Sequence, residues 1–374
     1  MKRMSLLAAC VAALTAVPCL ADADKAPTAD PKIQIAILLD TSSSMDGLIN
    51  QTREQLWRIV NTFATAKRDG KRPRLELALY EYGNDGLPAK NDYVRRVVPL
   101  TTDLDKVSES LFRLKTNGGE EYCGAVIGHA MKELEWSSRP GDLKLIYIAG
   151  NEPFTQGPVP FQNAVKAAIE RGIVVNTIHA GTEAEGISGQ WMAAAKLADG
   201  NYLFIDQNRA VARVDAPQDA ELANLSQQLN KTYIAYGAGG KQAMARQEEQ
   251  DKNAQGMSAS AASTRAKAKA SAFYDNSGWD LVDAKKEGKK VADMPVAALP
   301  VEMQKMDAKE REAYVEEKSK ERAELQAKIA RLSREREEYV QNELKKRASE
   351  GGKTMDDALI ESAKAQAARL NYSF

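Results

Sequence analysis

The chain has 374 residues, which is enough for one large domain with extensions or for two domains. Lys+Arg and Asp+Glu both total 52, and this balance gives no reason to expect nucleic acid or an anionic membrane as a partner. After the N-terminus, no apolar run approaches the roughly 20 residues that span a bilayer, so we expect no stable membrane span.

The first 21 residues have the pattern of an export signal. A basic "MKRM" precedes the apolar run "SLLAACVAALTAV", and Cys19 and Ala21 occupy the small-residue positions before a cleavage site. We expect a cleaved signal peptide over residues 1–21 and a mature protein in the periplasm or secreted, with Cys123 as its one cysteine. Lipid attachment at Cys10 or Cys19 fits less well, because the apolar core before Cys10 is short and a proline precedes Cys19. An uncleaved anchor is a further alternative.

Six apolar runs in the next part of the chain have the composition of buried strands. They are residues 33–39, 75–82, 94–100, 143–149, 174–178 and 202–205. Between them lie stretches with helical spacing, at 48–68, 103–115, 124–136, 161–172 and 188–200, and the segment 219–237 predicts a closing helix. This alternation predicts one α/β domain over residues 32–237, with a doubly wound, mainly parallel sheet covered by helices on both faces.

The composition changes after Gly237. Residues 238–300 are rich in Ala, Lys and Gln and predict a sparsely packed linker region, and residues 301–374 predict a charged, helical tail. The first interpretation of the tail is a long solvated helix. A coiled coil is the alternative, because three apolar residues fit a heptad before Arg336 interrupts it, namely Leu325, Ile329 and Leu332.

The strand at 33–39 runs directly into an aspartate and a cluster of hydroxyls, "DTSSS". Asp40, Ser42 and Ser44 at spacing two can turn three oxygens toward one point in a tight loop. Oxygen ligands suit Mg²⁺, with Mn²⁺ or Ca²⁺ as alternatives. Open α/β sheets bind ligands at the carboxyl ends of their strands, which is where this loop stands. The competing interpretation is that a serine only caps the following helix.

"IAILLDTSSSMDG" followed by a helix resembles the first strand and metal loop of a von Willebrand factor type A (VWA) domain, the fold also found in integrin I domains. The resemblance covers about residues 32–237, and the tail resembles the C-terminal region of exported bacterial proteins that carry such a domain. It implies a metal-ion-dependent adhesion site, in which the aspartate usually acts through water and two serines bind Mg²⁺ directly. These roles carry over to Asp40, Ser42 and Ser44.

The sequence departs from the family at its other two metal loops. In "TNGGEEYCGAVIGHA", Glu121 or Tyr122 stands where the family has a threonine, and Glu121 could supply a carboxylate oxygen. The alternative is that Glu120 and Glu121 are solvated loop charges. In "IYIAGNEPF", Gly150 stands where the family has an aspartate, and the neighbouring Asn151 and Glu152 could reach the metal. We expect Gly150→Asp to restore the usual ligand set, provided that the backbone there does not need the positive φ that glycine allows. Two outcomes stay open: a divergent site that binds Mg²⁺ through Asp40, Ser42, Ser44 and Glu121, or a loop that binds no metal.

The function implied by the resemblance is a non-enzymatic protein-binding module of the cell envelope, an adhesion or scaffold protein. A protein partner would offer an acidic side chain to the open position on the cation, and the helical tail would give reach or self-association. His129 and His179 are the only histidines, and no catalytic triad order, zinc spacing or phosphate loop stands out. Two alternatives remain: a metal-assisted hydrolase or hydrolase subunit, and a structural envelope protein with a vestigial metal site.

Overall fold

The structure is a computed structural model that describes residues 30–43, 45–205, 214–347 and 355–374. The predicted signal peptide and Ser44 lie outside the described residues. We call residues 30–205 the head, residues 214–347 the arm and residues 355–374 the C-terminal segment. No helix among the described residues is both long enough and apolar enough to cross a membrane.

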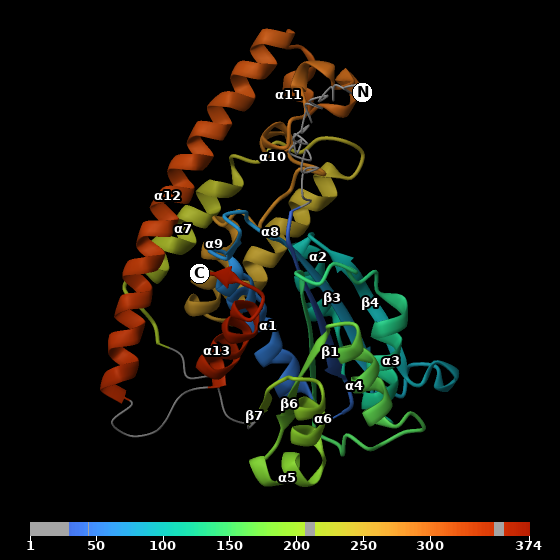
Figure 1. The fold of residues 1–374 in the computed structure, drawn as a ribbon. Coiled ribbons are helices and arrows are strands. Elements are labelled where there is room, and N and C mark those ends of the chain that lie inside the picture. Colours follow the sequence, from blue (N-terminus) through green and yellow to red (C-terminus); the bar gives the residue numbers. More distant parts are fainter. Residues whose placement is uncertain (1–29, 44, 206–213, 348–354) are drawn as a thin grey trace, which may run out of the picture.

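A six-stranded sheet forms the centre of the head, in the order β4-β3-β1-β5-β6-β7 (Figure 1). All six predicted strands are confirmed, and all pairs are parallel except β3 with β4. Their bounds are β1 (Lys32–Asp40), β3 (Arg74–Tyr82), β4 (Val94–Thr101), β5 (Leu143–Gly150), β6 (Val174–Ala180) and β7 (Tyr202–Ile205). Two further strands of two residues each, β2 (Lys67–Arg68) and β8 (Tyr372–Ser373), pair with each other and are too short for a sequence pattern to show.

Helices cover both faces of this sheet, as predicted. One face carries α1 (Asp46–Phe63) and α2 (Leu104–Arg113), and the other carries α3 (Cys123–Glu133), α4 (Phe161–Glu170) and α6 (Trp191–Leu197). The short turn η1 (Ala89–Asn91) precedes β4, and α5 (Glu183–Ser188) follows β6. Along β1, Ile35 and Ile37 pack in the α1 core while Ala36 and Leu38 pack in the α3 core. The apolar run that predicted a strand is therefore apolar because both of its faces are buried.

The arm consists of helices that pack on one another and on the head. They are α7 (Asp219–Asn230), α8 (Gly240–Met257), α9 (Ala259–Lys269), α10 (Leu281–Lys286), α11 (Val301–Gln304) and α12 (Ala308–Arg347), with short turns η2 (Val291–Asp293) and η3 (Val296–Ala298). Residues 238–300 are thus largely helical where the sequence predicted a sparsely packed linker, because small alanine side chains let α7, α8 and α9 pack closely. The domain boundaries at residues 237 and 300 stay predictions.

Buried charges hold the arm to the head. The guanidinium of Arg265 on α9 is almost fully buried, donates to Asp105 of α2 and Asp251 of α8, and lies 4.6 Å from the ring of Trp57 on α1. Lys269, also on α9, donates to the other oxygen of Asp251. Each buried cation therefore has a carboxylate partner, which is the condition under which buried charge is tolerated.

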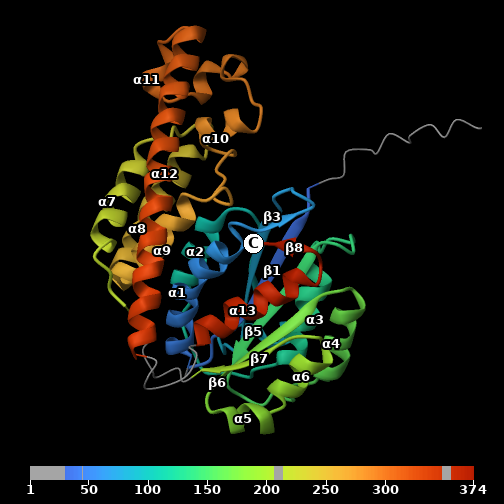
Figure 2. The same ribbon diagram turned by 60° about the vertical axis from the view of Figure 1, so that its left-hand side comes forward.

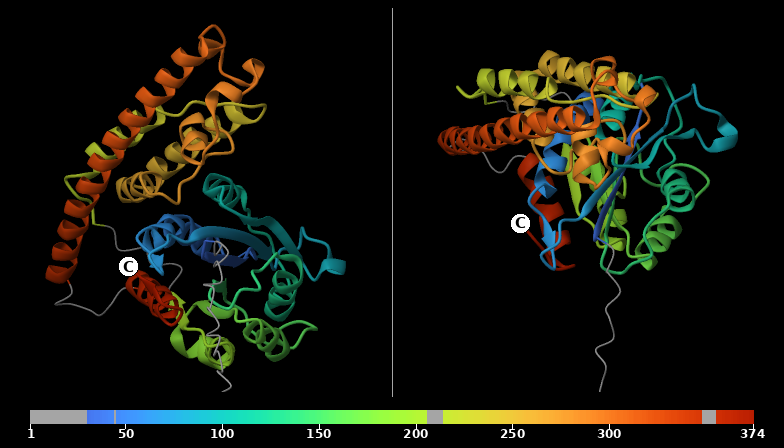
Figure 3. Two further views of the ribbon diagram at one scale, coloured as in Figure 1. Left: turned by 45° about the horizontal axis from the view of Figure 1, so that its top comes forward. Right: turned by 90° about the horizontal axis from the view of Figure 1, so that it is seen from above.

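The predicted long helix in the tail is confirmed as α12, which has 40 residues and runs along the outer side of the arm (Figure 3). Four buried positions seven residues apart face the rest of the arm: Val315, Arg322, Ile329 and Arg336. Arg322 donates to Asp280, Asp283 and the carbonyl of Thr232, and Arg336 pairs with Asp219. The arginine that interrupts the apolar heptad is thus a buried ion-pair residue. The buried positions of α12 pack against the rest of the same arm. Self-association through this helix stays a prediction.

The C-terminal segment returns to the head. Its helix α13 (Met355–Ala368) packs against β7 and α1 (Figure 2), and the side-chain amides of Gln366 and Asn176 exchange hydrogen bonds of 2.6 and 3.2 Å. The Tyr372 hydroxyl donates to the carbonyl of Lys32 at 2.8 Å. The helix predicted at 219–237 exists as α7, but it packs against α9 and α12. On the face of the sheet that carries α1, the helix beside β7 is therefore α13, from the C-terminal segment.

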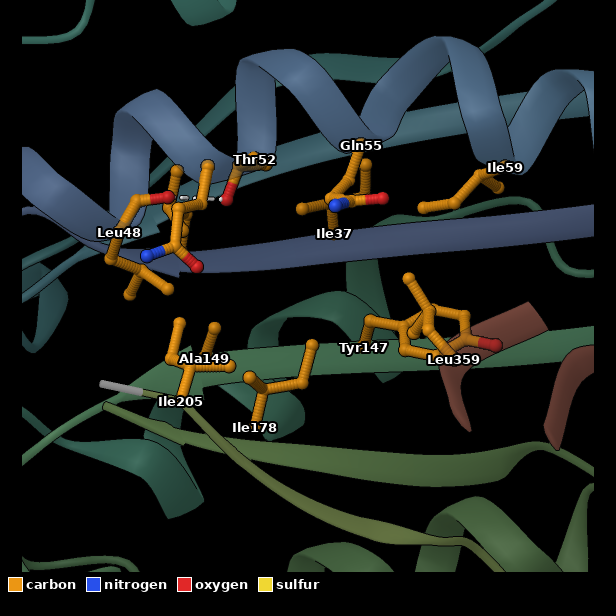
Figure 4. Close-up of a pocket in the computed structure, with 12 residues that line it drawn as sticks. Ile37, Leu48, Thr52, Gln55, Ile59, Tyr147, Ala149, Ile178, Ile205 and Leu359 are labelled. Carbon is orange, nitrogen blue, oxygen red and sulfur yellow. Dashed lines mark hydrogen bonds between the residues drawn. The ribbon is translucent and has the colours of Figure 1, made fainter. Parts of the chain in front are cut away.

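A small apolar cavity of about 50 Å³ lies between the sheet, α1 and α13 (Figure 4). Leu39, Leu48 and Ile178 are among its lining residues, and Leu359 of α13 closes it. The Tyr147 hydroxyl is buried there without a hydrogen-bond partner among the described residues. None of the predicted metal ligands lines this cavity.

Replacing Arg265 by alanine should destabilise the protein strongly, because Asp105 and Asp251 would each lose a cationic partner while staying buried. We expect a loss of about 3–5 kcal/mol in the free energy of unfolding. Urea denaturation of the full chain measures this. Arg331→Ala is the control, since the Arg331 side chain is 72% exposed and its ion pair spans 3.8 Å; it should cost no more than about 0.5 kcal/mol. Equal effects of the two substitutions would contradict the role of the buried network.

Candidate metal site

The predicted site lies at the carboxyl edge of the sheet. Asp40 ends β1 and pairs in register with Tyr82 at the end of β3, and Gly150 at the end of β5 pairs with His179 near the end of β6. Loops that follow these parallel strands meet at one edge, which is where open α/β sheets bind ligands. The strand order thus brings the first and third predicted metal loops together.

Asp40 and Ser42 present unpaired oxygens at this edge. The Asp40 side chain is fully buried, and its Oδ1 accepts a hydrogen bond of 2.8 Å from the Ser42 backbone N–H. Asp40 Oδ2 and the Ser42 hydroxyl are buried without a hydrogen-bond partner among the described residues. The first residue before α1 is Met45, which makes no side-chain cap, so Ser42 is not a helix cap. Ser44, the third predicted ligand, cannot be placed because it lies outside the described residues.

Glu121 joins Asp40 from the second loop. Its side chain is buried, whereas that of Glu120 is exposed, so only the latter fits the alternative of a solvated charge. A Cβ on Gly83 would lie 2.7 Å from Glu121 Cγ and 2.8 Å from Asp40 Oδ1. Gly83 also has a φ of +75°, a conformation that glycine adopts at low cost. Gly83 therefore gives the two carboxyl groups room to approach each other, and no sequence motif identified it.

Both carboxyl groups sit in an environment that disfavours their negative charge. Burial raises the pKa of Asp40 to about 8, with the charge of Glu121 adding to the rise and the Ser42 N–H opposing it. Burial likewise raises the pKa of Glu121 to about 7, and the charge of Glu152 adds to it. Two neighbouring carboxylates of this kind are stabilised either by protons or by a cation.

Position 150 of the third loop carries no carboxylate, and it has no room for one. A Cβ on Gly150 would lie 2.5 Å from the Tyr82 hydroxyl and 3.0 Å from Asp40 Oδ2. The Tyr82 hydroxyl donates to the carbonyl of Ala149 at 3.1 Å and so occupies the space beside Gly150. We expected Gly150→Asp to restore the family's ligand set. The structure contradicts this expectation, because the new side chain would clash with the Tyr82 hydroxyl. The structure places Asn151 beside Asp40, where its backbone lowers the pKa of that carboxyl.

The donors that the structure brings together are oxygens: Asp40, Ser42 and Glu121. This set fits a hard divalent cation such as Mg²⁺, which carboxylates and hydroxyls bind well. Among the described residues, no group of three or more His, Cys, Asp and Glu side chains is arranged to hold a metal, so a site here depends on hydroxyl and water ligands as well.

His129 is not placed as a base for hydrolysis at this site. His129 lies between Asp92 at 3.1 Å and Glu133 at 2.7 Å, outside the cluster of Asp40, Ser42 and Glu121. His179 is buried beside Trp191, and burial lowers its pKa. The arrangement at the carboxyl edge can hold a cation and present it to a partner.

Residues 34–209 match the family model of the von Willebrand factor type A domain. A search of curated proteins finds no match to the chain. Among solved structures, the conserved hypothetical protein BatB from Bacteroides thetaiotaomicron is 17% identical, with a TM-score of 0.36, over 46% of this chain and 90% of that chain. The SpRpn10 VWA domain is 15% identical, with a TM-score of 0.34, over 46% and 88% of the two chains.

Proximal thread matrix protein 1 from the mussel byssus, solved with a zinc-occupied MIDAS motif, is 12% identical, with a TM-score of 0.35, over 48% of this chain and 43% of that chain. Similarity at this level says nothing about the function of this chain. The family match, the strand order and the position of Asp40 at the end of the central strand agree with one another. The chain therefore contains a von Willebrand factor type A domain, over residues 34–209.

Proposed function

We propose that the protein is a non-enzymatic, cation-dependent protein-binding module that uses a divergent metal-ion-dependent adhesion site. The observation that carries the proposal is the buried carboxyl group of Asp40. Its Oδ2 has no partner among the described residues, and its Oδ1 lies on the side of Ser42 and Glu121. Mg²⁺ is the cation we expect, with Mn²⁺ and Ca²⁺ as the other candidates.

The donor set explains why binding is favoured over catalysis. A divalent cation would neutralise the two carboxylates that burial otherwise disfavours, and it would keep an open position toward solvent. An acidic side chain from a protein partner can fill that position, and a charge-assisted contact of this kind anchors an interface. Hydrolysis would also need a positioned base or nucleophile. The placement of His129 between Asp92 and Glu133 supports the binding function over the hydrolase alternative.

We also propose that the protein acts in the cell envelope, either in the periplasm or secreted. The support for this location is the export-signal pattern of residues 1–21. N-terminal sequencing of the protein from its host should find a mature chain that begins near Asp22. A start at Met1 in a cytoplasmic fraction would contradict the location and leave the binding function untouched.

Mg²⁺ should stabilise the folded protein, because a ligand that binds only the folded state adds RT ln(1 + [L]/Kd) to its stability. At a hundredfold excess over Kd this amounts to about 2.7 kcal/mol. Thermal melts with Mg²⁺ and with chelator measure the shift. Asp40→Ala should abolish it, because it removes the buried carboxylate at the centre of the site.

The matched control is Asp293→Ala, which removes an exposed aspartate on η2 and should keep the full Mg²⁺ shift. Glu121→Gln should reduce the shift, since it leaves one carboxylate in the cluster. A wild-type protein that melts at the same temperature in both conditions up to millimolar Mg²⁺ would rule out the adhesion-site function.

Gly150→Asp should fail to strengthen Mg²⁺ binding, because its Cβ would meet the Tyr82 hydroxyl at 2.5 Å. Overpacking of this kind costs about 1–3 kcal/mol of stability. Combining it with Tyr82→Phe removes that hydroxyl, so the double variant should bind Mg²⁺ more tightly than Tyr82→Phe alone. Isothermal calorimetry on the four proteins tests this. Tighter binding by Gly150→Asp alone, without loss of stability, would show that the Tyr82 contact does not block the position.

A further inference from the structure

The loops around the candidate site form an acidic surface, although the whole chain is balanced in charge. These loops, with the short helices η1 and α5 that they include, are residues 41–46, 83–93, 114–122, 151–160 and 181–188, all at the carboxyl edge of the sheet. As the structure describes them, Lys90 and Lys115 are their only basic residues. Besides Asp40 and Glu121, they carry seven acidic residues that we call the acidic rim: Asp46, Asp85, Asp92, Glu120, Glu152, Glu183 and Glu185. Each rim side chain is exposed or half-buried.

Hydrogen bonds join several of these loops into one surface. The Thr116 hydroxyl donates to Asp46 at 2.9 Å, and the Asn117 backbone N–H donates to the carbonyl of Thr41 at 3.1 Å. The Glu121 backbone N–H donates to the Gln156 side chain at 3.0 Å, which ties the second loop to the third. The loops that follow β1 and β5 are thus tied to the loop that carries Glu121, and they present their rim residues on a preformed scaffold.

Two aromatic rings stand on the same surface. Tyr93 and Tyr122 meet edge to face, with ring centroids 5.8 Å apart, and both are half-buried. Tyr122 directly follows Glu121, and Tyr93 directly follows Asp92. A lysine or arginine of a partner that approaches these carboxylates would also meet the faces of aromatic rings, which attract cations.

We propose that the partner presents a basic surface, in which lysines and arginines flank the one acidic side chain that reaches the cation. This inference rests on the proposed function. A divalent cation offsets the charges of Asp40 and Glu121, but the acidic rim stays negative and repels a partner that is acidic throughout. Opposite charge on the flanking residues removes this repulsion and steers the encounter, with an effect that falls as salt increases.

Labelled synthetic peptides test this with the full-length protein. The peptides KKGDGKK, SSGDGSS and EEGDGEE share one central aspartate and differ in flanking charge, and fluorescence anisotropy in Mg²⁺ measures their Kd. We expect KKGDGKK to bind at least about tenfold more tightly than SSGDGSS, and EEGDGEE to bind most weakly. The advantage of KKGDGKK should shrink between about 50 and about 300 mM NaCl, because salt screens exposed charges.

Rim variants locate the effect. Asp85→Asn combined with Glu183→Gln removes two exposed rim carboxylates, which should weaken KKGDGKK several-fold and leave SSGDGSS nearly unchanged. The matched control is Glu317→Gln combined with Glu338→Gln, which removes two exposed carboxylates from α12, far along the chain from the rim. The control should bind all three peptides as the wild type does.

The outcomes separate this inference from the function on which it rests. If SSGDGSS or EEGDGEE binds in Mg²⁺ as tightly as KKGDGKK, the basic partner is excluded and cation-dependent binding stands. If KKGSGKK binds as tightly as KKGDGKK and chelator has no effect, the cation-dependent function fails and the basic preference stands. If no peptide binds measurably in Mg²⁺, the inference is overturned.

Discussion

The burial of one carboxylate, Asp40, is the constraint on which the candidate site depends. The central strand β1 has parallel neighbours on both sides and apolar layers on both faces, so the residue that ends it has no access to water. One of its oxygens is held by the Ser42 N–H and the other has no partner among the described residues. The bare backbone of Gly83, the Tyr82 hydroxyl beside Gly150 and the second carboxyl of Glu121 all pack around this group. A cation is the one addition that would stabilise both carboxylates in their charged forms.

Both apolar contacts and paired polar groups hold the rest of the chain to the head. Arg265 binds Asp105 across the boundary between head and arm. Inside the arm, Arg265 and Lys269 bind Asp251, and Arg322 binds Asp280. Such pairs add little net stability compared with an apolar core, but each one penalises any arrangement that leaves a buried charge unpaired. This gives the alanine-rich helices a defined position. The arm packs on α1, and α1 begins directly after the loop that carries Ser42. Helix α1 therefore connects the candidate site with the arm.

The strands and the position of the loop after β1 could be predicted from the sequence because their signals are local: an apolar run, a following Asp-x-Ser and an amphipathic helix. Glu121 could be proposed from its place in the second loop, and the structure brings it to Asp40. The Tyr82 hydroxyl beside Gly150 could not be foreseen, since it depends on the register of β3 against β1. The sequence also did not indicate that α13 packs beside β7 in place of α7, because this contact joins segments more than a hundred residues apart. Arg336 appeared to interrupt a seam, and only its partner Asp219 on α7 shows why it is buried.

The central claim is that Asp40, Ser42 and Glu121 hold a divalent cation at the carboxyl edge of the sheet. Anomalous diffraction from crystals grown with Mn²⁺ tests it most directly, because Mn²⁺ takes the same oxygen ligands as Mg²⁺ and can be located without assumptions about the protein. We expect one strong anomalous peak among the side-chain oxygens of these residues, within about 2.0–2.6 Å of the nearest of them. Crystals of Asp40→Ala grown in the same way should lack the peak. Wild-type crystals with no peak at this edge, in the presence of millimolar Mn²⁺, would contradict the account.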